Sequence, residues 1–348
     1  MLDGFADEGI AEQWTPVALS REVGRHPYGL TLASERVVLF RDGQGQVAAL
    51  HDRCPHRGVK LSLGKVEDGC LTCPFHGWRF GGDGANRHIP FNPLPEEKRQ
   101  RYAATRFPVR ERGGFIWLYT RPGAEAPEEP AVPEVLEQEG LSVWRYVETW
   151  RSHWTRAMEN MLDSPHLPFI HRWTLGAGMR RRMKEDSRME IQVHPLPTGF
   201  RTTWTLDGGS SEAYLDWMRP NGMTLGVPVP KRTLRLHVWC VPVDANHTRM
   251  FVASARSFLR YNPLGWLFDQ FNRRVIHEDR AVVESSDPAE VPPSGEEKSV
   301  ATDRATLAFR RWYLEHKRGS ASEEASPELQ SLTARAPLPV SSGPVHPG

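Results

Sequence analysis

Short apolar runs separated by turns fill the first third of the chain. Residues 36–40 and 46–50 are rich in Val, Leu and Ala, and the Asp-Gly pair between them is typical of a hairpin turn. Further turns rich in Gly and Asp lead to a last strand at 115–120. This pattern predicts a small all-β domain over residues 10–120.

The pattern changes at residues 121–134, which contain four prolines and several glutamates. Neither a helix nor a sheet tolerates this composition well, so we predict a linker there, followed by a second domain over 135–318. Residues 319–348 are rich in Ser, Ala, Pro and Glu, and we expect this tail to be disordered.

The second domain mixes extended and helical patterns. The extended segments are 143–149, 188–194, 199–206, 232–241 and 249–255, and the helical ones are 152–162, 264–286 and 303–316. We therefore predict an α+β fold, with an N-terminal all-β domain followed by an α+β domain whose antiparallel sheet is flanked by helices.

The length of 348 residues fits two domains, and the charge is nearly balanced, with 44 Lys and Arg against 43 Asp and Glu. A net charge of +1 gives no field that would hold a nucleic acid or an anionic membrane. The chain has no secretory signal pattern and no apolar run long enough to span a bilayer. We therefore expect a cytoplasmic protein with neither partner.

Two short segments combine cysteine with histidine. Cys54 and His56 stand two residues apart, and Cys73 and His76 stand three apart. Two thiolates and two imidazoles brought together form a metal site, either for zinc or for a [2Fe-2S] cluster with two sulfur ligands on one iron and two nitrogen ligands on the other. Cys70 also makes a Cys-x-x-Cys pair with Cys73, which alone would indicate a redox dithiol.

The stretches Cys54-Pro55-His56-Arg57-Gly58 and Cys73-Pro74-Phe75-His76-Gly77-Trp78 resemble the Rieske [2Fe-2S] motif of the non-haem iron oxygenases. The resemblance implies that 10–120 is a Rieske domain, in which Cys54 and Cys73 bind one iron and His56 and His76 the other. Arg57 and Trp78 would shape the loops, with Trp78 shielding the cluster from water.

A second dense motif runs from Asn160 to His171. On a regular helix His166 and His171 would lie about 140° apart, too far to chelate one metal. Prolines 165 and 168 break the helix and let both imidazoles turn inward, while Asp163 can hydrogen-bond a ligating histidine. A pair of ordinary buried histidines would give the same pattern, so a third ligand is needed.

The helical segment 264–286 offers that ligand. Phe268, Phe271, Val275, Asp279 and Val282 recur at helical spacing, and Asp279 is the one charge in this stripe. A carboxylate that faces a core is costly unless it is paired or bound to metal. We therefore predict that His166, His171 and Asp279 form the two-His, one-carboxylate site of non-haem Fe(II) oxygenases, with Glu278 and His277 as competing third ligands.

This region resembles the catalytic domain of Rieske non-haem iron oxygenases, in the vanillate and dicamba demethylase branch. The resemblance implies a homotrimer in which the cluster of one chain serves the iron of the next across Asp163, with Asn160 beside the iron. It also implies electrons from NAD(P)H through a separate reductase, with or without a ferredoxin, and hydroxylation or oxidative demethylation of a small aromatic or alicyclic substrate.

Two other functions stay open from the sequence. Arene cis-dihydroxylation would use the same two metal sites. A Rieske electron-transfer protein with a small-molecule-binding second domain would use only the cluster. The basic run from Arg180 to Lys184 is either a docking site for an acidic ferredoxin or a solvated loop.

Overall fold

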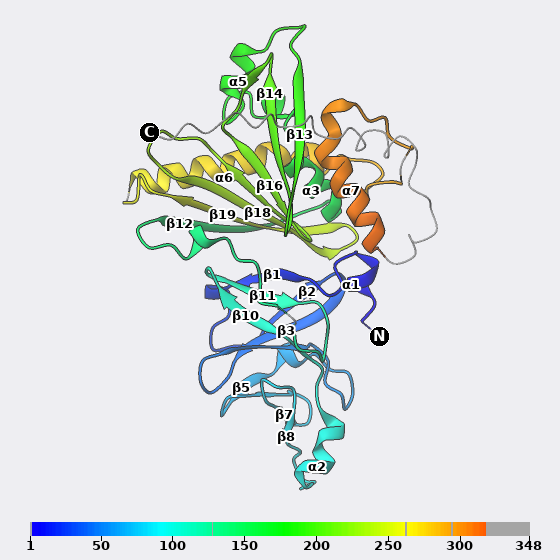
Figure 1. Cartoon of the computed structure of the whole chain (residues 1–348). Helices are drawn as coiled ribbons and strands as arrows, with labels where there is room; N and C mark the ends of the chain where they lie inside the picture. The colour runs from blue at the N-terminus through cyan, green and yellow to red at the C-terminus, as the bar shows by residue number, and fades with distance from the viewer. Residues whose placement is uncertain (1, 127, 262, 294, 318–348) are drawn as a thin grey trace, which may run out of the picture.

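The computed structural model describes residues 2–126, 128–261, 263–293 and 295–317. They form an N-terminal part and a C-terminal part stacked end to end (Figure 1). Residues 319–348, where we predict a disordered tail, lie outside the described residues. None of the helices in the described ranges has both the length and the apolarity needed to cross a membrane.

Three small antiparallel sheets make up the N-terminal part, in the orders β1-β11-β10, β2-β3-β4-β9 and β5-β6-β7-β8. The strands are β1 (Trp14–Leu19), β2 (Tyr28–Leu32), β3 (Glu35–Arg41), β4 (Val47–His51), β5 (Lys65–Glu67), β6 (Cys70–Thr72), β7 (Arg79–Phe80), β8 (Asn86–His88), β9 (Arg106–Phe107), β10 (Val109–Arg112) and β11 (Phe115–Tyr119). Two one-turn helices accompany them, α1 (Gly4–Asp7) and α2 (Glu96–Arg99).

The predicted hairpin within this part is confirmed. β3 pairs with β4 so that Val37 lies opposite His51. In the turn, the Asp42 carboxylate accepts hydrogen bonds from the backbone N–H groups of Gln44 and Gln46, both at 2.9 Å. Asp favours turns for this reason, because its side chain can satisfy backbone donors nearby.

The segment that we predict as a linker forms no helix or strand over residues 121–126 and 128–133. Side chains of β10 and β1 nevertheless bind this segment. Arg110 pairs with Glu129 at 2.8 Å, and the indole N–H of Trp14 donates to the carbonyl of Glu128 at 2.8 Å. The glutamates of this segment therefore serve as partners for the arginines of the N-terminal part.

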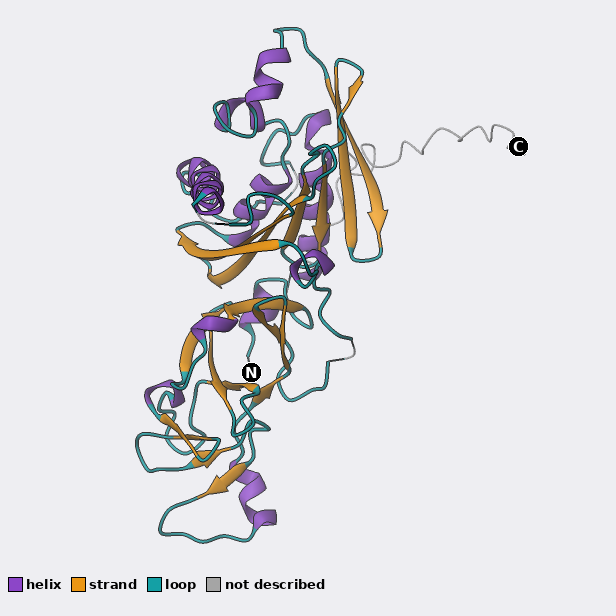
Figure 2. Ribbon diagram, turned by 90° about the vertical axis from the view of Figure 1, so that its left-hand side faces the viewer, coloured by secondary structure: helices purple, strands orange, loops and turns teal. Residues whose placement is uncertain are grey.

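The C-terminal part contains one eight-stranded antiparallel sheet in the order β12-β19-β18-β17-β16-β14-β13, with β15 paired to β14. Its strands are β12 (Ser142–Trp150), β13 (Met189–Leu196), β14 (Gly199–Leu206), β15 (Gly209–Ser210), β16 (Tyr214–Met218), β17 (Gly222–Gly226), β18 (Leu234–Asp244) and β19 (His247–Arg256). Its helices are α3 (Trp154–Leu162), α4 (Leu167–Ile170), α5 (Ala177–Arg182), α6 (Leu264–Val283) and α7 (Arg304–His316). The predicted α+β class with a helix-flanked antiparallel sheet is confirmed (Figure 2).

One hydrophobic core continues from the N-terminal part into the sheet of the C-terminal part. The ring of Phe115 on β11 lies 5.3 Å from that of Trp239 on β18 and 6.2 Å from that of Phe251 on β19, between centroids. Trp117 meets Trp239 edge to face at 5.4 Å. The opposite face of these strands is thereby left for α3 and α6.

The buried face of helix α6 differs from the apolar stripe that the sequence predicts for residues 264–286. Its buried positions are Gly265, Asn272, Val275, Ile276, Asp279 and Val283, whereas Phe271 and Val282 are 38% and 49% exposed. The helix carries a second apolar arc that points to solvent, and periodicity cannot tell which of two arcs faces a sheet. The position of Asp279 on the buried face is unaffected, since both stripes contain it.

The basic run after the second motif is largely exposed, as a solvated segment would be, but its first three residues are helical and do not form a loop. Arg180, Arg181 and Arg182 form the last turn of α5 and are exposed. Basic side chains at the C-terminal end of a helix interact favourably with its dipole.

Candidate active site

Two loops of the N-terminal part carry the predicted cluster ligands. One follows β4 and contains Cys54, and the other joins β6 to β7 and contains Cys73. In each loop the cysteine carbonyl accepts a hydrogen bond from the glycine four residues later, at 2.8 Å from Gly58 and 3.0 Å from Gly77. Both glycines have positive φ, 72° and 68°, which glycine adopts without a Cβ clash. The two loops are therefore copies of one tight turn.

These turns bring the four predicted ligands together. The Nδ1 atoms of His56 and His76 lie 3.2 Å apart, and Trp78 stacks on His56 with 4.6 Å between ring centroids. Cys54 and Cys73 are buried, at 2% exposure each. Burial, followed by a hydrogen bond with Cys73, raises the pKa of Cys54 to about 11. Thiolates so placed need a bound cation, so the donor set fits an iron–sulfur cluster.

Two nearby residues stand apart from this group. Cys70, at the start of β6, lines a separate surface hollow with Asp42 and Arg87. Arg57 is exposed. The structure thus gathers Trp78 and the four predicted ligands at one spot, and leaves Cys70 and Arg57 outside it.

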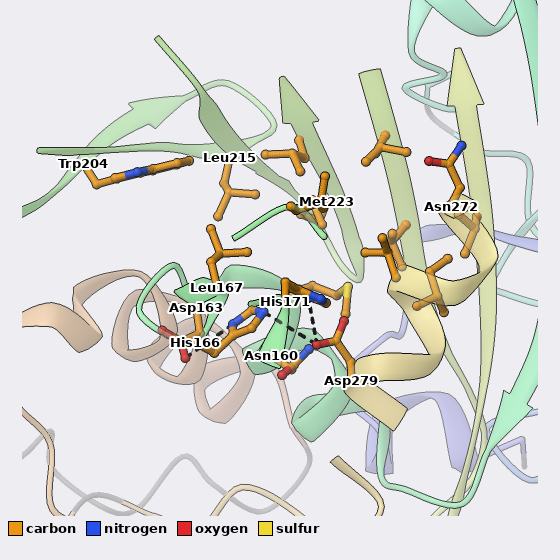
Figure 3. Close-up of a pocket in the computed structure, with 18 residues that line it drawn as sticks. Asn160, Asp163, His166, Leu167, His171, Trp204, Leu215, Met223, Asn272 and Asp279 are labelled. Carbon is orange, nitrogen blue, oxygen red and sulfur yellow. Dashed lines mark ion pairs between the residues drawn. The ribbon is translucent and has the colours of Figure 1, made fainter. Parts of the chain in front are cut away.

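The second predicted site lies between α3, α4 and α6. Helix α3 ends before Asp163, which is extended at φ −84° and ψ 117°, as expected for a helix broken there. His166 precedes α4 and His171 follows it. Their Nε2 atoms lie 3.6 Å and 3.1 Å from Oδ1 of Asp279 (Figure 3). One ligand atom from each of the three residues falls within a 4.8 Å span, as a shared metal ion requires.

Carboxylates also face the far side of both imidazoles. Glu278 Oε2 lies 2.9 Å from Nδ1 of His171 and accepts a hydrogen bond from the Thr174 hydroxyl at 2.6 Å. Asp163 Oδ2 lies 3.6 Å from Nδ1 of His166. At hydrogen-bond distance, Glu278 holds the proton on Nδ1 of His171 and leaves its Nε2 free to bind a metal. Burial lowers the pKa of His171, but Asp279 and Glu278 together raise it above its usual value.

This contact of Glu278 was missed by the sequence analysis, which treats it as a competing ligand. The residue sits directly before Asp279 on α6, and that neighbouring position was the available signal. The other competitor, His277, faces away and contacts Glu148 Oε2 at 2.9 Å. Adjacent positions on a helix point about 100° apart, so only one of His277, Glu278 and Asp279 can lie at the centre of the buried face.

Unsatisfied polar atoms test whether a cation fits. Oδ1 of Asp279 is buried and accepts no hydrogen bond from the described residues, whereas the buried, unpaired Nδ2 of Asn160 is a donor that a cation could not satisfy. A buried carboxylate without a partner is costly, and a divalent metal ion between the three ligands would remove that cost. The donor set therefore fits a mononuclear iron.

A cavity with a volume of about 80 Å³ lies next to His166, His171 and Asp279. The strands that form its roof alternate: Val238 and Val252 face the cavity, while their neighbours Trp239 and Phe251 face the N-terminal part. Among the described lining residues, Trp204 is the one Phe, Tyr or Trp side chain. The cavity is lined by Asn160, Met161, Asp163, His166, Leu167, His171, Leu175, Trp204, Leu215, Met223, Leu225, Leu236, Val238, Val252, Asn272, Val275, Ile276 and Asp279.

Two family models match the chain, one in each part. Residues 13–98 match the Rieske [2Fe-2S] domain. Residues 150–316 match the vanillate O-demethylase oxygenase C-terminal domain. The first match contains both cysteine–histidine loops, and the second contains His166, His171 and Asp279.

Individual relatives agree with these matches. The chain is 29% identical to methylxanthine N1-demethylase NdmA of Pseudomonas putida over 90% of this chain and 92% of that one. The solved structure of that protein superposes with a TM-score of 0.75, covering 92% and 94% of the two chains. The chain is also 35% identical to the 3-chlorobenzoate-3,4-dioxygenase oxygenase subunit of Comamonas testosteroni, over 70% of this chain and 58% of that one.

The fold, the two sites and the matches to both family models point to one conclusion. The proteins that the chain resembles are named as demethylases, monooxygenases and dioxygenases, which does not favour an electron-transfer or binding protein without oxygenase activity. The cofactors of this family are a Rieske cluster and a mononuclear iron, and the donor sets described above suit both. The chain belongs to the Rieske non-haem iron oxygenases.

Proposed function

We propose that this protein is a cytoplasmic monooxygenase that hydroxylates or oxidatively demethylates a small organic substrate. Electrons come from NAD(P)H through a separate reductase, directly or by way of a ferredoxin. Residues 10–120 form the cluster domain, 121–134 the linker and 135–318 the catalytic domain. The sheet topology supports this division, because within the described ranges no sheet contains strands from both parts.

The observation that carries the proposal is the buried triad of His166, His171 and Asp279 at one wall of an apolar cavity. Iron bound there would supply O2 activation at open coordination positions. The protein's own contribution is geometric. Glu278 and Asp163 orient the two imidazoles, Asp279 holds the third position, and the apolar lining keeps bulk water from the substrate.

In the proposed reaction one oxygen atom of O2 enters a C–H bond of the substrate. The other oxygen leaves as water, and the reductase supplies two electrons, accompanied by two protons. Attack on an O- or N-methyl group gives a hemiacetal or hemiaminal that releases formaldehyde. The cavity lies against the triad, so a bound substrate would present one end to it.

The distance between the two sites supports a homotrimer. The cluster loops adjoin the β5–β8 sheet at one end of the molecule, and the triad lies by α3 and α6 beyond the large sheet (Figure 1). Apolar side chains are exposed at both ends, Leu63 and Phe75 near the cluster loops and Trp173 near the triad, at 70%, 59% and 77%. Such patches suit a head-to-tail ring, in which the cluster of one chain reaches the iron of the next across Asp163.

Mixed subunits test this ring. A Cys73→Ser chain lacks the cluster and a His166→Ala chain lacks the iron, so each alone is inactive. When the two are unfolded and refolded together, or co-expressed, heterotrimers should regain part of the activity. Activity that never returns, from a mixture shown to form mixed trimers, would contradict electron transfer between chains.

The oxygenase itself is tested by counting metals and oxygen. We expect about three irons and two acid-labile sulfides per chain, and a Rieske-type EPR signal after reduction with dithionite. With a surrogate reductase and NADH, substrate should then accelerate O2 uptake with one oxygen atom appearing in the product. Zinc without sulfide would overturn the proposal, and a cis-dihydrodiol product would overturn monooxygenation.

A further inference from the structure

One polar side chain in the cavity lies apart from the metal ligands. Asn272 is on α6, seven residues before Asp279, which places it about 10 Å farther along the helix axis. It is only 5% exposed. Figure 3 shows it at the opposite end of the cavity from the pair formed by His166 and Asp279.

The amide of Asn272 has no hydrogen-bond partner for Nδ2 among the described residues. Asn221, which is also fully buried, shows what a structural asparagine does in this fold: its Nδ2 donates to the Thr15 hydroxyl and to the Cys240 carbonyl, both at 3.0 Å. A buried NH2 group without an acceptor is destabilising, and a bound molecule that supplies an acceptor would remove that penalty. Whichever way the amide is turned, it offers one NH2 donor group and one carbonyl acceptor.

The rest of the cavity gives the substrate little else to bond. Apart from Asn272, the three proposed metal ligands, and Asn160 and Asp163 beside them, its lining consists of Leu, Ile, Val and Met side chains and the indole of Trp204. No Lys or Arg is among the lining residues that the structure describes. At the Asn272 end of the cavity, a carboxylate or sulfonate would lose its hydration without a cationic side chain to pair with, because the metal site lies at the other end.

We propose that the substrate is a small neutral molecule, apolar over most of its surface, with one carbonyl or amide group that hydrogen-bonds to Asn272. This inference rests on the proposed function, because it assigns the substrate class of the same site. The cavity volume of about 80 Å³ limits the size. An apolar cavity of roughly 150 Å³ holds benzene, so even a single ring requires lining side chains to move outward, and we take one ring as the upper limit.

The geometry also sets the orientation. With its polar group on Asn272, a one-ring molecule has its opposite end directed at His166, His171 and Asp279. A substituent para to the carbonyl or amide is therefore the group that reacts. Asn272 acts here as a specificity residue that positions the substrate.

Binding of three matched probes tests the inference. The anaerobic, metal-loaded enzyme is titrated by calorimetry with benzamide, benzoate and toluene, which share a ring and differ in one group. We expect benzamide to bind at least tenfold more tightly than benzoate. Asn272→Leu should weaken benzamide binding at least tenfold and leave toluene binding within twofold.

Val275→Ala is the matched control, because Val275 lines the same cavity one turn farther along α6. This variant should weaken the binding of benzamide and of toluene by the same factor. The inference is overturned if benzoate binds as tightly as benzamide, if benzamide does not bind, or if Asn272→Leu changes both neutral probes equally. Since binding is measured without O2 or electrons, these outcomes are independent of the iron, sulfide and O2-uptake tests of the proposed function.

Discussion

The Nδ1 atom of His171 lies 2.9 Å from a carboxylate oxygen of Glu278, while Nε2 of the same ring faces Asp279 at 3.1 Å. Two consecutive residues of α6 thus serve two sides of one imidazole. Glu278→Gln should keep the shape and lose the charge that orients the ring. We expect iron affinity to fall roughly 10- to 100-fold, measured as iron retained against a graded chelator.

Glu284→Gln is the control for that variant. Glu284 directly follows the last residue of α6 and is partly buried, but it accepts hydrogen bonds from Arg280 at 2.8 Å and from the backbone N–H of Arg151 at 2.9 Å. This variant should bind iron like the unmodified protein. Equal iron loss in both variants would mean that α6 is merely loosened and that Glu278 has no specific role.

Asp279→Ala separates the two metal sites. Removal of this carboxylate leaves two histidines, which bind Fe(II) weakly, whereas the cluster loops are at the other end of the molecule. Iron should fall from about three to about two atoms per chain with sulfide unchanged at about two, and turnover should be lost. Chemical analysis of iron and sulfide checks this, and full retention of the third iron would rule out Asp279 as a ligand.

Cys73 and Cys70 offer a matched pair for the cluster. Cys73→Ser should abolish both the sulfide and the Rieske-type EPR signal, because one of the two predicted sulfur ligands is gone. Cys70→Ser should preserve both, since Cys70 lines a separate hollow. If instead the Cys70 variant loses the cluster, the assignment of ligands to Cys54 and Cys73 is wrong.

His237 should make stability fall with acid. It is buried on β18, where Nδ1 lies 2.8 Å from the Thr224 hydroxyl. Burial, followed by the charge of Arg235, lowers its pKa to about 3. The unfolded chain has the ordinary value of about 6.5, so between these two pH values the unfolded state binds the extra proton. Stability is therefore complete above pH 6.5 and decreases as the pH falls towards 3.

The expected loss between pH 6.5 and pH 4.5 is about 2 kcal/mol in the free energy of unfolding. His237→Gln cannot titrate, so its urea-unfolding free energy should vary less with pH by about that amount. His194 is exposed on β13, so His194→Gln serves as the control. Its unfolding free energy should vary with pH as that of the unmodified protein does. Parallel pH profiles for all three proteins would show that His237 is not the titrating group.

The sequence alone was enough to predict most of the candidate metal ligands. Cys54, His56, Cys73 and His76 lie within short turns, where spacing along the chain largely determines spacing in space. Pro165 and Pro168 likewise predicted a break in the helix, which allows the side chains of His166 and His171 to converge. The alternation of short apolar runs and turns also predicted the all-β character of the first part.

Tertiary structure decided whatever depends on contacts between distant segments. Asp279 could be placed on a buried face, but only packing against the sheet showed which arc of α6 is buried, and therefore that Glu278 meets His171 and that Asn272 enters the cavity. The apolar lining combines residues from β14 to β19 with residues from α3, α4 and α6. Local periodicity reports how apolar a face is, whereas its partner is set by long-range packing, and for that reason the shape and polarity of the cavity appeared only in the fold.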